Sequence, residues 1–406
     1  MSARISPARA AAYEVVRRVF EEDAYADRAL RSASEGLDER DRALARQLAF
    51  GTVQRVRTLD HAIETLGKRP VRKLDAPVLA ALRLGAYQLG FLGGVPRYAA
   101  VNESVELVRR ARLERAVPFT NAVLRRVGDG IERLLAELPE GALKHSYPDW
   151  IWDVWRRDLG EERALSLMRA QNEPPPVVVR HVRGQTPDGS ATDIPGAYEV
   201  ERVDAESLAR GEIWPQSRGS QLAGLVVGSQ PGERVLDVCA APGGKTAMLA
   251  GDVVAVEANE SRARELADNL VRLGRDDVRV VHADGRDLPP ELTEFDRALV
   301  DAPCSGLGVL ASRPDLRWRS QPLPELQLEL LRAAAERVRP GGAIVYSVCT
   351  INADEAEAVV DASGLDVDPS IGDEWPAFRH PVRPEFLQTL PHVHGTTGFF
   401  VARLAT

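Results

Sequence analysis

Apolar side chains recur every three or four positions through residues 6–128, as the segments Ala12–Phe20 and Leu79–Phe91 illustrate. This spacing places the apolar side chains on one face of an α-helix. A succession of such segments, separated by short polar stretches, predicts a set of helices that pack together. We therefore expect residues 1–140 to form an all-α domain.

The helical pattern continues beyond this domain and then stops. Tyr147–Trp155 is an aromatic stretch with helical spacing, and we expect its rings to pack in the protein interior. Pro174–Pro176 interrupts the helical pattern. The apolar runs Val177–Val182 and Ala197–Val203 that follow favour short strands. Residues 141–215 are thus predicted to form a connecting helical and small α/β module.

From residue 234 onward, short apolar runs alternate with helical patterns. Strands are expected at Arg234–Asp237, Val253–Glu257, Val278–Val281, Arg297–Asp301 and Ala343–Ser347. Helices are expected near residues 244–250, 260–273, 322–338 and 353–362. This alternation predicts a doubly wound parallel sheet, which binds its ligand at the carboxyl ends of the strands. Residues 216–406 are therefore predicted to form an α/β Rossmann-like domain, so that the chain as a whole is multidomain.

Length and cysteine content narrow the class of protein. A chain of 406 residues fits two or three domains. No apolar run approaches the roughly 18 residues of a membrane span, and Met1–Ile5 lacks the apolar stretch of a signal peptide. The only cysteines are Cys239, Cys304 and Cys349, which argues against a disulfide framework. We expect a monomer in the reducing cytoplasm with no membrane partner.

The charge is distributed unevenly along the chain. The formal net charge is −8, yet residues 1–145 contain 25 Lys and Arg against 19 Asp and Glu, a net charge of +6. Arg109, Arg110, Arg112 and Arg115 lie close together, and Arg125 and Arg126 are expected at the end of a helix. A basic helical domain attached to an acidic enzyme suits RNA modification, because one domain can attract the phosphates. A solvated helix face is the alternative interpretation of the same charges.

The first predicted strand of the α/β domain ends in a glycine-containing turn, Asp237–Thr246. Glycines allow a tight turn and close approach of the backbone to a ligand. Glu257 follows at the end of the next strand, where it suits ribose hydroxyls, and Asp284 follows the third strand, where it suits a base amine. The series fits S-adenosyl-L-methionine (SAM) or a dinucleotide. A phosphate-binding Walker loop needs glycine where Cys239 stands, so an NTPase is disfavoured.

Two further cysteines follow the fourth and fifth predicted strands, in Asp301–Gly308 and Tyr346–Ile351. One cysteine at such a position is usually structural, whereas two beside a nucleotide-type pocket favour thiol chemistry. Methylation of a pyrimidine at carbon 5 needs a thiolate, because that carbon becomes nucleophilic only after addition at carbon 6. Asp301 is placed to bind the amino edge and ring nitrogen of the cytosine. Cys239 is expected to be a small buried residue whose backbone lines the cofactor pocket.

Several motifs together resemble the Nop/Sun family of RNA 5-methylcytosine methyltransferases. The matching stretches are Val235–Thr246, Leu299–Gly308, Arg313–Arg319, Tyr346–Ile351 and Gly398–Leu404. The helical region is similar to the NusB-type RNA-binding domain, through Asp41–Ala45, Phe50–Gly51, Leu82–Leu89, Val95–Pro96, Ala100–Glu103 and Asn121–Arg126. The pairing of the two domains resembles the branch of the family that acts on small-subunit (16S) ribosomal RNA.

The resemblance implies a role for individual residues. Cys349 would be the nucleophile, Cys304 would assist release of the methylated product, and Asp301 would be the third catalytic residue. The residues implied to contact SAM are Cys239, Ala240, Ala241, Pro242, Gly243, Gly244, Lys245, Glu257, Asp284 and Asp301. SAM is the implied cofactor and small-subunit ribosomal RNA the implied partner.

Two other hypotheses remain open. A DNA cytosine methyltransferase would use Cys304 as its nucleophile and leave Cys349 without a role. A non-catalytic RNA-binding factor would retain the fold alone. The second hypothesis draws on departures from the family pattern at Val348, Ala353, Ala356 and Thr397. His392 and His394 have metal-ligand spacing, but no Cys or Asp cluster accompanies them, so no metal site is predicted.

Overall fold

The computed structural model describes residues 5–406, which form two compact units. Residues 1–4, the start of the expected helical domain, lie outside the described part of the chain. The first unit extends to Asn172 and also contains the separate segment Leu310–Arg319. The rest of the chain from Glu173 onward forms the second unit. The chain therefore leaves the second unit, contributes a short segment to the first, and returns.

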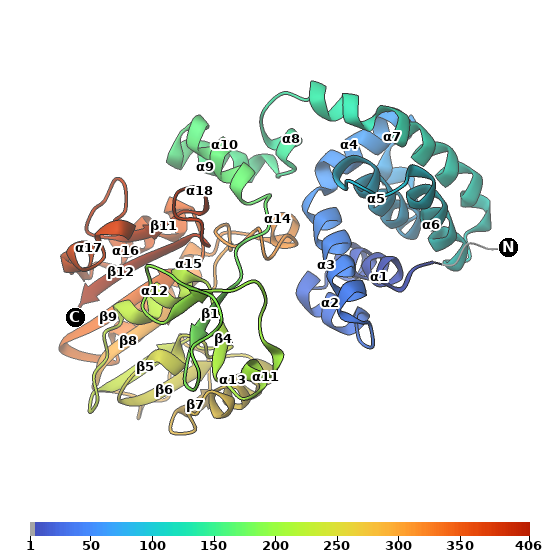
Figure 1. Ribbon diagram of the computed structural model, residues 1–406. Helices are drawn as coiled ribbons and strands as arrows, with labels where there is room; N and C mark the ends of the chain where they lie inside the picture. The colour runs from blue at the N-terminus through green and yellow to red at the C-terminus, as the bar shows by residue number, and fades with distance from the viewer. Residues whose placement is uncertain (1–4) are drawn as a thin grey trace. The chain divides into compact units, whose positions relative to one another are not determined.

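The first unit is all-helical, as the hydrophobic periodicity predicts (Figure 1). Its helices are α1 (Pro7–Glu21), α2 (Ala26–Ala33), α3 (Glu39–Gln54), α4 (Val56–Gly67), α5 (Ala76–Phe91), α6 (Arg97–Arg110), α7 (Val117–Glu137), α8 (Ala142–His145), α9 (Asp149–Leu159), α10 (Glu161–Ala170) and α14 (Leu316–Arg319). Single 3-10 turns, η1 (Val71–Lys73) and η2 (Glu114–Ala116), occur between them. No helix within residues 5–406 is both long enough and apolar enough to cross a membrane.

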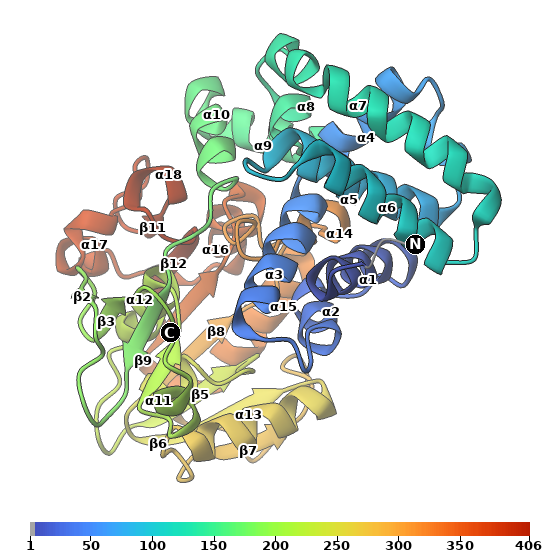
Figure 2. The same ribbon diagram turned by 45° about the vertical axis from the view of Figure 1, so that its right-hand side comes forward.

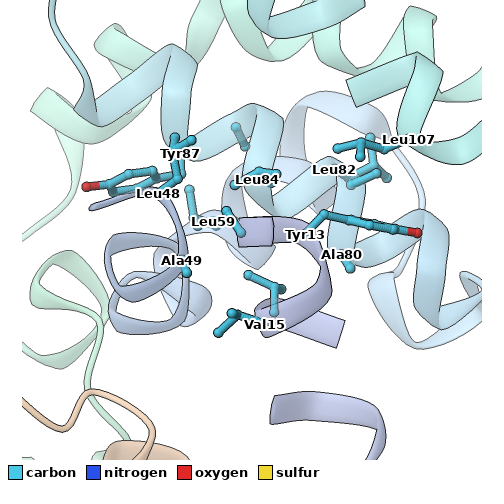
Figure 3. Close-up of a cluster of buried hydrophobic side chains, with 14 of the residues drawn as sticks. Tyr13, Val15, Leu48, Ala49, Leu59, Ala80, Leu82, Leu84, Tyr87 and Leu107 are labelled. Atoms are coloured by element: carbon cyan, nitrogen blue, oxygen red, sulfur yellow. The ribbon is translucent and has the colours of Figure 1, made fainter. Parts of the chain in front are cut away.

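The core of the first unit is built from the apolar stripes of its helices. Figure 3 shows Leu48 of α3, Leu59 of α4, and Leu82 and Leu84 of α5 among the buried side chains. Helix α5 is apolar on most of its sides, which is typical of a helix surrounded by others. Each buried leucine stabilises the fold by about 1.5–3 kcal/mol relative to an exposed one.

The short helix α14 places a buried cation in this first unit. Arg317 is 1% exposed, and its guanidinium lies 3.9 Å from the ring centre of Tyr147. The guanidinium donates to three backbone carbonyls, those of Gln54, Ser146 and Gln171. Burial lowers the pKa of Arg317 to about 10, which leaves it a cation at neutral pH. The neighbouring Trp318 donates to the carbonyl of Val53 at 2.7 Å.

The second unit is built on a large mixed sheet in the order β10-β12-β9-β8-β5-β6-β7, with β11 paired to β12. Its strands are β5 (Arg234–Val238), β6 (Asp252–Glu257), β7 (Arg279–His282), β8 (Phe295–Asp301), β9 (Val338–Val348), β10 (Asp366–Val367), β11 (Leu387–Thr389) and β12 (Phe399–Ala405). Strands β5 to β9 are parallel and correspond to the five predicted strands. The prediction of a wholly parallel sheet is wrong at one edge, because β12 runs antiparallel to β9, β10 and β11.

Helices cover both faces of this sheet. They are α12 (Arg218–Val226), α13 (Glu260–Arg272), α15 (Pro324–Ala335) and α16 (Glu357–Ser363), followed by the short α17 (Ser370–Glu374), η5 (Pro376–Phe378) and α18 (Pro391–His394). Successive strand residues point to opposite faces. Accordingly, Val300 and Tyr346 pack in one core with α15 and α16. Leu299 and Val345 pack in the other core with α12 and α13, and Figure 2 shows α13 beside β6 and β7.

A smaller antiparallel sheet in the order β2-β3-β1-β4 precedes the large one in sequence. Its strands are β1 (Val178–His181), β2 (Ser190–Ala191), β3 (Ala197–Glu199) and β4 (Ile213–Pro215), with α11 (Ala205–Ala209) before β4. The expected connecting module, residues 141–215, is thus divided between the two units. The buried Arg180 of β1 donates to the side chain of Gln216 and to the carbonyl of Gly244. The small sheet therefore supports the turn that follows β5.

Two local expectations are wrong. The helix expected near residues 244–250 is only a single 3-10 turn, η3 (Thr246–Met248), because the chain must reach Gly251 (φ 93°) and enter β6 at once. Arg125 and Arg126 lie in the middle of α7 and do not end a helix. The aromatic packing expected for Tyr147–Trp155 is confirmed at its two ends, since Tyr147 and Trp155 are fully buried with ring centres 5.3 Å apart.

We expect Arg317→Ala to destabilise the first unit by about 3 kcal/mol, because the carbonyls of Gln54 and Ser146 lose the guanidinium donor, whereas that of Gln171 keeps Gln54 Nε2. Urea unfolding followed by tryptophan fluorescence measures the change. Arg156→Ala, which removes an exposed arginine of the same unit paired with Asp153, should change the free energy of unfolding by less than about 0.5 kcal/mol. Equal stability of the two variants would contradict the structural role of Arg317.

Candidate active site

The loop after β5 turns sharply at the carboxyl end of the central strand. Cys239 and Gly243 have left-handed backbone conformations, with φ of 65° and 101°. The amide of Ala240 donates to the carbonyl of Val256 at 2.9 Å, which holds the loop against β6. A Cβ atom on Gly243 would lie 2.9 Å from Leu266 of α13, so the close passage requires glycine. Because β5 lies between β6 and β8, this loop stands where a doubly wound sheet binds its ligand.

Two acidic residues lie farther along the same edge. Glu257 ends β6, is 5% exposed, and accepts a hydrogen bond from the Asn259 amide at 3.0 Å. One of its carboxylate oxygens lies 3.6 Å from Arg262. Asp284 follows β7 and is exposed, and the hydrogen bonds from Arg286 hold the pKa of its carboxyl below the usual range. Both carboxylates are thus available as acceptors at the carboxyl edge of the sheet.

This edge suits the nucleoside part of SAM. A Cβ atom on Gly244 would lie 2.7 Å from the indole nitrogen of Trp214, so the turn passes close to this side chain and has room only for glycine. Glu257 offers acceptors for ribose hydroxyls, and Asp284 offers one for an adenine amine. Asp237 lies beneath the loop with its Oδ1 atom buried and without a hydrogen-bond partner among the described residues. The donor and acceptor set of the edge therefore fits this cofactor.

Asp301 connects the cofactor loop to the strand that leads to Cys349. Its Oδ2 atom lies 2.6 Å from Lys245 Nζ, and its Oδ1 atom accepts from Ser347 Oγ at 2.8 Å. Lys245 also stands over the ring of Phe399, 5.0 Å from its centre. The carboxylate of Asp301 is half-buried, so it remains accessible to a ligand at this edge.

The two remaining cysteines meet beside Asp301. Cys304 follows β8, Cys349 follows β9, and their sulfur atoms lie 3.4 Å apart. Both side chains are half-buried. The Gly308 amide donates to the Cys349 carbonyl at 3.0 Å, which joins the two loops through the backbone. The structure thus brings Asp301, Cys304 and Cys349 together at one end of two neighbouring strands.

The two sulfurs differ in acidity. The hydrogen bond from Cys304 lowers the pKa of the Cys349 thiol, and the positive charge of Lys245 acts in the same direction. The hydrogen bond to Cys349, together with burial, raises the pKa of Cys304 well above its usual range. Cys349 is therefore the more acidic of the two thiols.

Cys239 lies in a different environment. Burial raises the pKa of its thiol to about 12, and the nearby carboxylates of Glu257 and Asp301 add to the shift. A thiol of this acidity is protonated at neutral pH and unreactive as a nucleophile. The expectation that Cys239 contributes through its backbone agrees with its place in the turn after β5.

The residues that depart from the family pattern occupy positions that tolerate them. Val348 is fully buried in the apolar core beneath α15, on the opposite face of β9 from Cys349. Ala356 is 1% exposed in the same core. Thr397 pairs its hydroxyl with Ser217 Oγ at 2.6 Å. Val348 therefore removes no hydroxyl from the neighbourhood of the two sulfurs.

Two residues near Cys304 and Cys349 were missed in the sequence. Ser347 precedes Cys349 by two positions, so strand alternation alone places both side chains on one face. Its hydroxyl holds Asp301. Glu355 is fully buried behind the cysteines and accepts hydrogen bonds from the loops that carry them. No local pattern distinguishes Glu355 from the exposed acids around it.

The first unit contains a cationic cavity of about 540 Å³ between η1 and η2. Four exposed cations line it, namely Arg69, Lys73, Arg112 and Arg115, and they outnumber the two acids of the lining, Asp75 and Glu114. None of them has an ion-pair partner within residues 5–406. By contrast Arg109, which lies near Arg112 in the sequence, is paired with Glu106 and Glu114. The guanidinium of Arg69 stands 5.3 Å from the ring centre of Phe119. Unpaired cations beside an aromatic ring suit a nucleic acid backbone and its bases.

The ring of His394 is hydrogen-bonded to the backbone in a way that does not suit a metal ligand. Its Nδ1 atom accepts a hydrogen bond from the Leu390 amide at 2.9 Å, and its Nε2 atom lies 3.2 Å from the Ala377 carbonyl. Both ring nitrogens are thus engaged with the backbone of their own region. Within residues 5–406, no group of three or more His, Cys, Asp or Glu side chains is arranged to hold a metal ion.

Comparison with known proteins links both units to characterised families. A family model described as 16S rRNA methyltransferase RsmB/F matches residues 225–405, and the NusB family model matches residues 6–129. The probable ribosomal RNA small subunit methyltransferase B of Synechocystis sp. is 32% identical, over 98% of this chain and 99% of that protein. The ribosomal RNA small subunit methyltransferase B of Thermus thermophilus is 36% identical, over 89% of this chain and 85% of that protein.

A solved structure shares the fold over the whole length. The crystal structure of PH0851 superimposes with a TM-score of 0.82, covers 100% of both chains, and is 22% identical in sequence. Together with the sequence relatives, this similarity confirms the resemblance stated from the motifs, the helical NusB-like domain and the α/β methyltransferase domain.

The buried carboxyl of Asp237 predicts a pH dependence of stability. Burial raises its pKa from 3.8 to about 7, so the unfolded chain releases this proton first as the pH rises. The free energy of unfolding therefore falls between about pH 4 and pH 7 because of this group, and Asp237→Asn removes that fall. We expect urea unfolding of the variant to show a slope that is shallower by up to about 1.4 kcal/mol per pH unit. If the free energy of unfolding depends on pH in the same way in the variant and the wild type, the raised pKa of Asp237 is contradicted.

Proposed function

The chain belongs to the RsmB/F family of 16S rRNA methyltransferases, and we propose that it methylates carbon 5 of a cytosine in small-subunit (16S) ribosomal RNA. Its methyl donor is S-adenosyl-L-methionine. The observation that carries the proposal is the pair of thiols 3.4 Å apart, of which Cys349 is the more acidic. Methylation of an exocyclic amine would need neither of them.

The reaction begins with Cys349. Its thiolate forms a bond to carbon 6 of the cytosine, and the electron pair of the carbon 5–carbon 6 double bond moves toward carbon 5. When bound, SAM would supply an electrophilic methyl group to carbon 5 and would leave as S-adenosyl-L-homocysteine, whose sulfur keeps the electron pair of the broken bond. A water molecule then takes the carbon 5 proton, and the electron pair of that bond restores the double bond. The carbon 6–sulfur bond breaks with its electron pair returning to Cys349.

Asp301 orients the base in this scheme. The carboxylate is held by Lys245 and Ser347, and it accepts a hydrogen bond from the cytosine amino group through its remaining lone pairs. A carboxylate fixed from two sides keeps its geometry while charge develops on the ring. Lys245 shields part of the Asp301 charge, which would otherwise disfavour the thiolate of Cys349.

Cys304 is assigned to the release step. Its thiol has a pKa raised by the contact with Cys349 and by burial, which makes it the weaker candidate for the first nucleophile. The hypothesis of a DNA-type methyltransferase, with Cys304 attacking, is thereby disfavoured. Two unlinked sulfurs so close together also suit a reducing compartment, because oxidation to a disulfide would remove the nucleophile.

The first unit supplies RNA affinity in this proposal. Its cationic cavity, lined by Arg69, Lys73, Arg112 and Arg115, attracts phosphates over a long range, and Phe119 adds a surface for stacking. The SAM-binding edge of the second unit is rich in carboxylates, so attraction of RNA phosphates must come from elsewhere in the molecule. Division of these tasks explains how a chain with a net charge of −8 binds RNA.

The roles of the two cysteines are tested with labelled SAM and small-subunit ribosomal RNA. We expect Cys349→Ala to lower methyl transfer by more than about 10³-fold. Cys304→Ala should accumulate a protein–RNA adduct, visible on a denaturing gel, because attack still occurs and release does not. SAM binding by both variants, measured by calorimetry, controls for folding. Methyl transfer by Cys349→Ala would overturn the mechanism.

The cationic cavity is tested by salt titration of RNA binding. The double variant Arg112→Ala/Arg115→Ala should bind RNA about 10-fold more weakly near 0.1 M salt, and the slope of log K against log salt should fall by about 1 for each phosphate that the variant no longer binds. Arg133→Ala/Arg156→Ala removes the same charge from exposed sites elsewhere in this unit and is the matched control. If both double variants lose the same affinity, the effect is one of net charge and the cavity has no special role.

A further inference from the structure

Behind the two cysteines lies a buried carboxylate that the reaction above does not use. Glu355 ends the 3-10 helix η4 (Ala353–Glu355) and is 0% exposed. Burying a carboxylate is unfavourable unless its oxygens are well hydrogen-bonded. An apolar side chain of similar size would fill the same space at lower cost. The position of Glu355 therefore requires a reason other than packing.

Donors surround this carboxylate on both oxygens. The donors to Oε1 are Ser305 N at 2.9 Å, Leu323 N at 3.0 Å and Gln327 Nε2 at 3.0 Å. The donors to Oε2 are Ser305 Oγ, Thr350 Oγ1 at 3.3 Å and Asn352 Nδ2 at 3.3 Å. All of these donors are neutral, so the contacts serve to fix positions and form no ion pair.

Two of the donors are the chain neighbours of the reactive cysteines. Ser305 follows Cys304, and Thr350 follows Cys349. The hydroxyl oxygens of Ser305 and Thr350 also lie 2.8 Å apart, so Thr350 can donate its proton either to Ser305 or to Glu355. One carboxylate thus joins the loop after β8 to the loop after β9 where the two sulfurs approach to 3.4 Å.

A second layer of contacts fixes Glu355 itself. Gln327 of α15 donates to the Pro303 carbonyl at 2.8 Å as well as to Glu355. The hydroxyl of Tyr346 donates to the Glu355 carbonyl at 2.7 Å. Helix α15 and strand β9 therefore hold Glu355 from two directions, and Gln327 also holds the loop after β8 at Pro303, just before Cys304.

We propose that Glu355 is a positioning residue for methyl transfer, which sets the distance and orientation of the Cys304 and Cys349 sulfurs by holding Ser305 and Thr350. Glu355 touches neither substrate nor cofactor and acts through the two loops. The inference rests on the proposed function, since the spacing of the sulfurs matters only if Cys349 attacks the base. Displacement of a reacting group by about 1 Å is enough to lower a rate by about 100-fold.

Glu355→Gln is the informative substitution. The shape is retained and the hydroxyls of Ser305 and Thr350 can turn to accept from the new amide, so the variant should fold. Weaker hydrogen bonds loosen the two loops. We expect kcat for methyl transfer to fall about 10- to 100-fold, while KM for RNA and the calorimetric affinity for SAM change by less than about twofold. Single-turnover adduct formation should slow by the same factor as kcat.

Asp354→Asn is the matched control, because it removes one negative charge at the adjacent, exposed position and should leave kcat within about twofold of wild type. If urea unfolding shows that Glu355→Gln fails to fold, Thr350→Val replaces it. This substitution deletes one hydroxyl donor at nearly constant shape, and kcat should again fall while SAM affinity stays unchanged.

The outcomes separate this inference from the proposed function. Full kcat in Glu355→Gln, with Cys349→Ala inactive, would overturn the positioning role alone. Parallel loss of kcat, KM and SAM affinity would also overturn it, because such a pattern reflects general damage to the fold. Activity in Cys349→Ala would instead overturn the proposed function on which the inference rests.

Discussion

Parallel pairing of β8 with β9, in the register that sets Asp301 opposite Ser347, is the constraint on which the reactive centre depends. Neighbouring strands lie about 4.8 Å apart, so residues that leave them at the same level begin close together. Cys304 and Cys349 follow the ends of β8 and β9, and the hydrogen bond from the Gly308 amide to the Cys349 carbonyl keeps the two loops in contact. A slip of the register by one residue would turn one of the two side chains to the other face of the sheet.

The loop after β5, where the proposed cofactor binds, and the pair of thiols share Asp301 as a neighbour. Lys245 reaches it from the loop after β5, and Ser347 reaches it from β9. A change on either side therefore affects the other through a single carboxylate. The same arrangement balances charge, because Lys245 offsets the acid that stands nearest the thiolate of Cys349. The central position of β5, between β6 and β8, makes this sharing possible.

Local patterns in the sequence were sufficient to predict the parallel strands and the residues that follow them. Apolar runs place Asp301, Cys304 and Cys349 at strand ends, and the carboxyl edge of a parallel sheet then gathers them. The antiparallel strand β12 was missed because a strand direction depends on where the chain returns, which no local pattern records. Glu355 and Arg317 were missed for a related reason. Each is a charged residue that is buried by partners far away in the sequence, and periodicity describes only near neighbours.

The discontinuity of the first unit has a consequence for synthesis on the ribosome. The carbonyls of Gln54, Ser146 and Gln171 are made long before Arg317, which arrives only after β5 to β8 have been translated. Until then the nascent helical unit carries acceptors that water must satisfy. Chains usually fold domain by domain from the N-terminus as they emerge. Here the first unit can form its last contacts only after the ribosome has translated the middle of the second unit. The two units therefore mature together, and a helical unit released early by premature termination would lack Arg317.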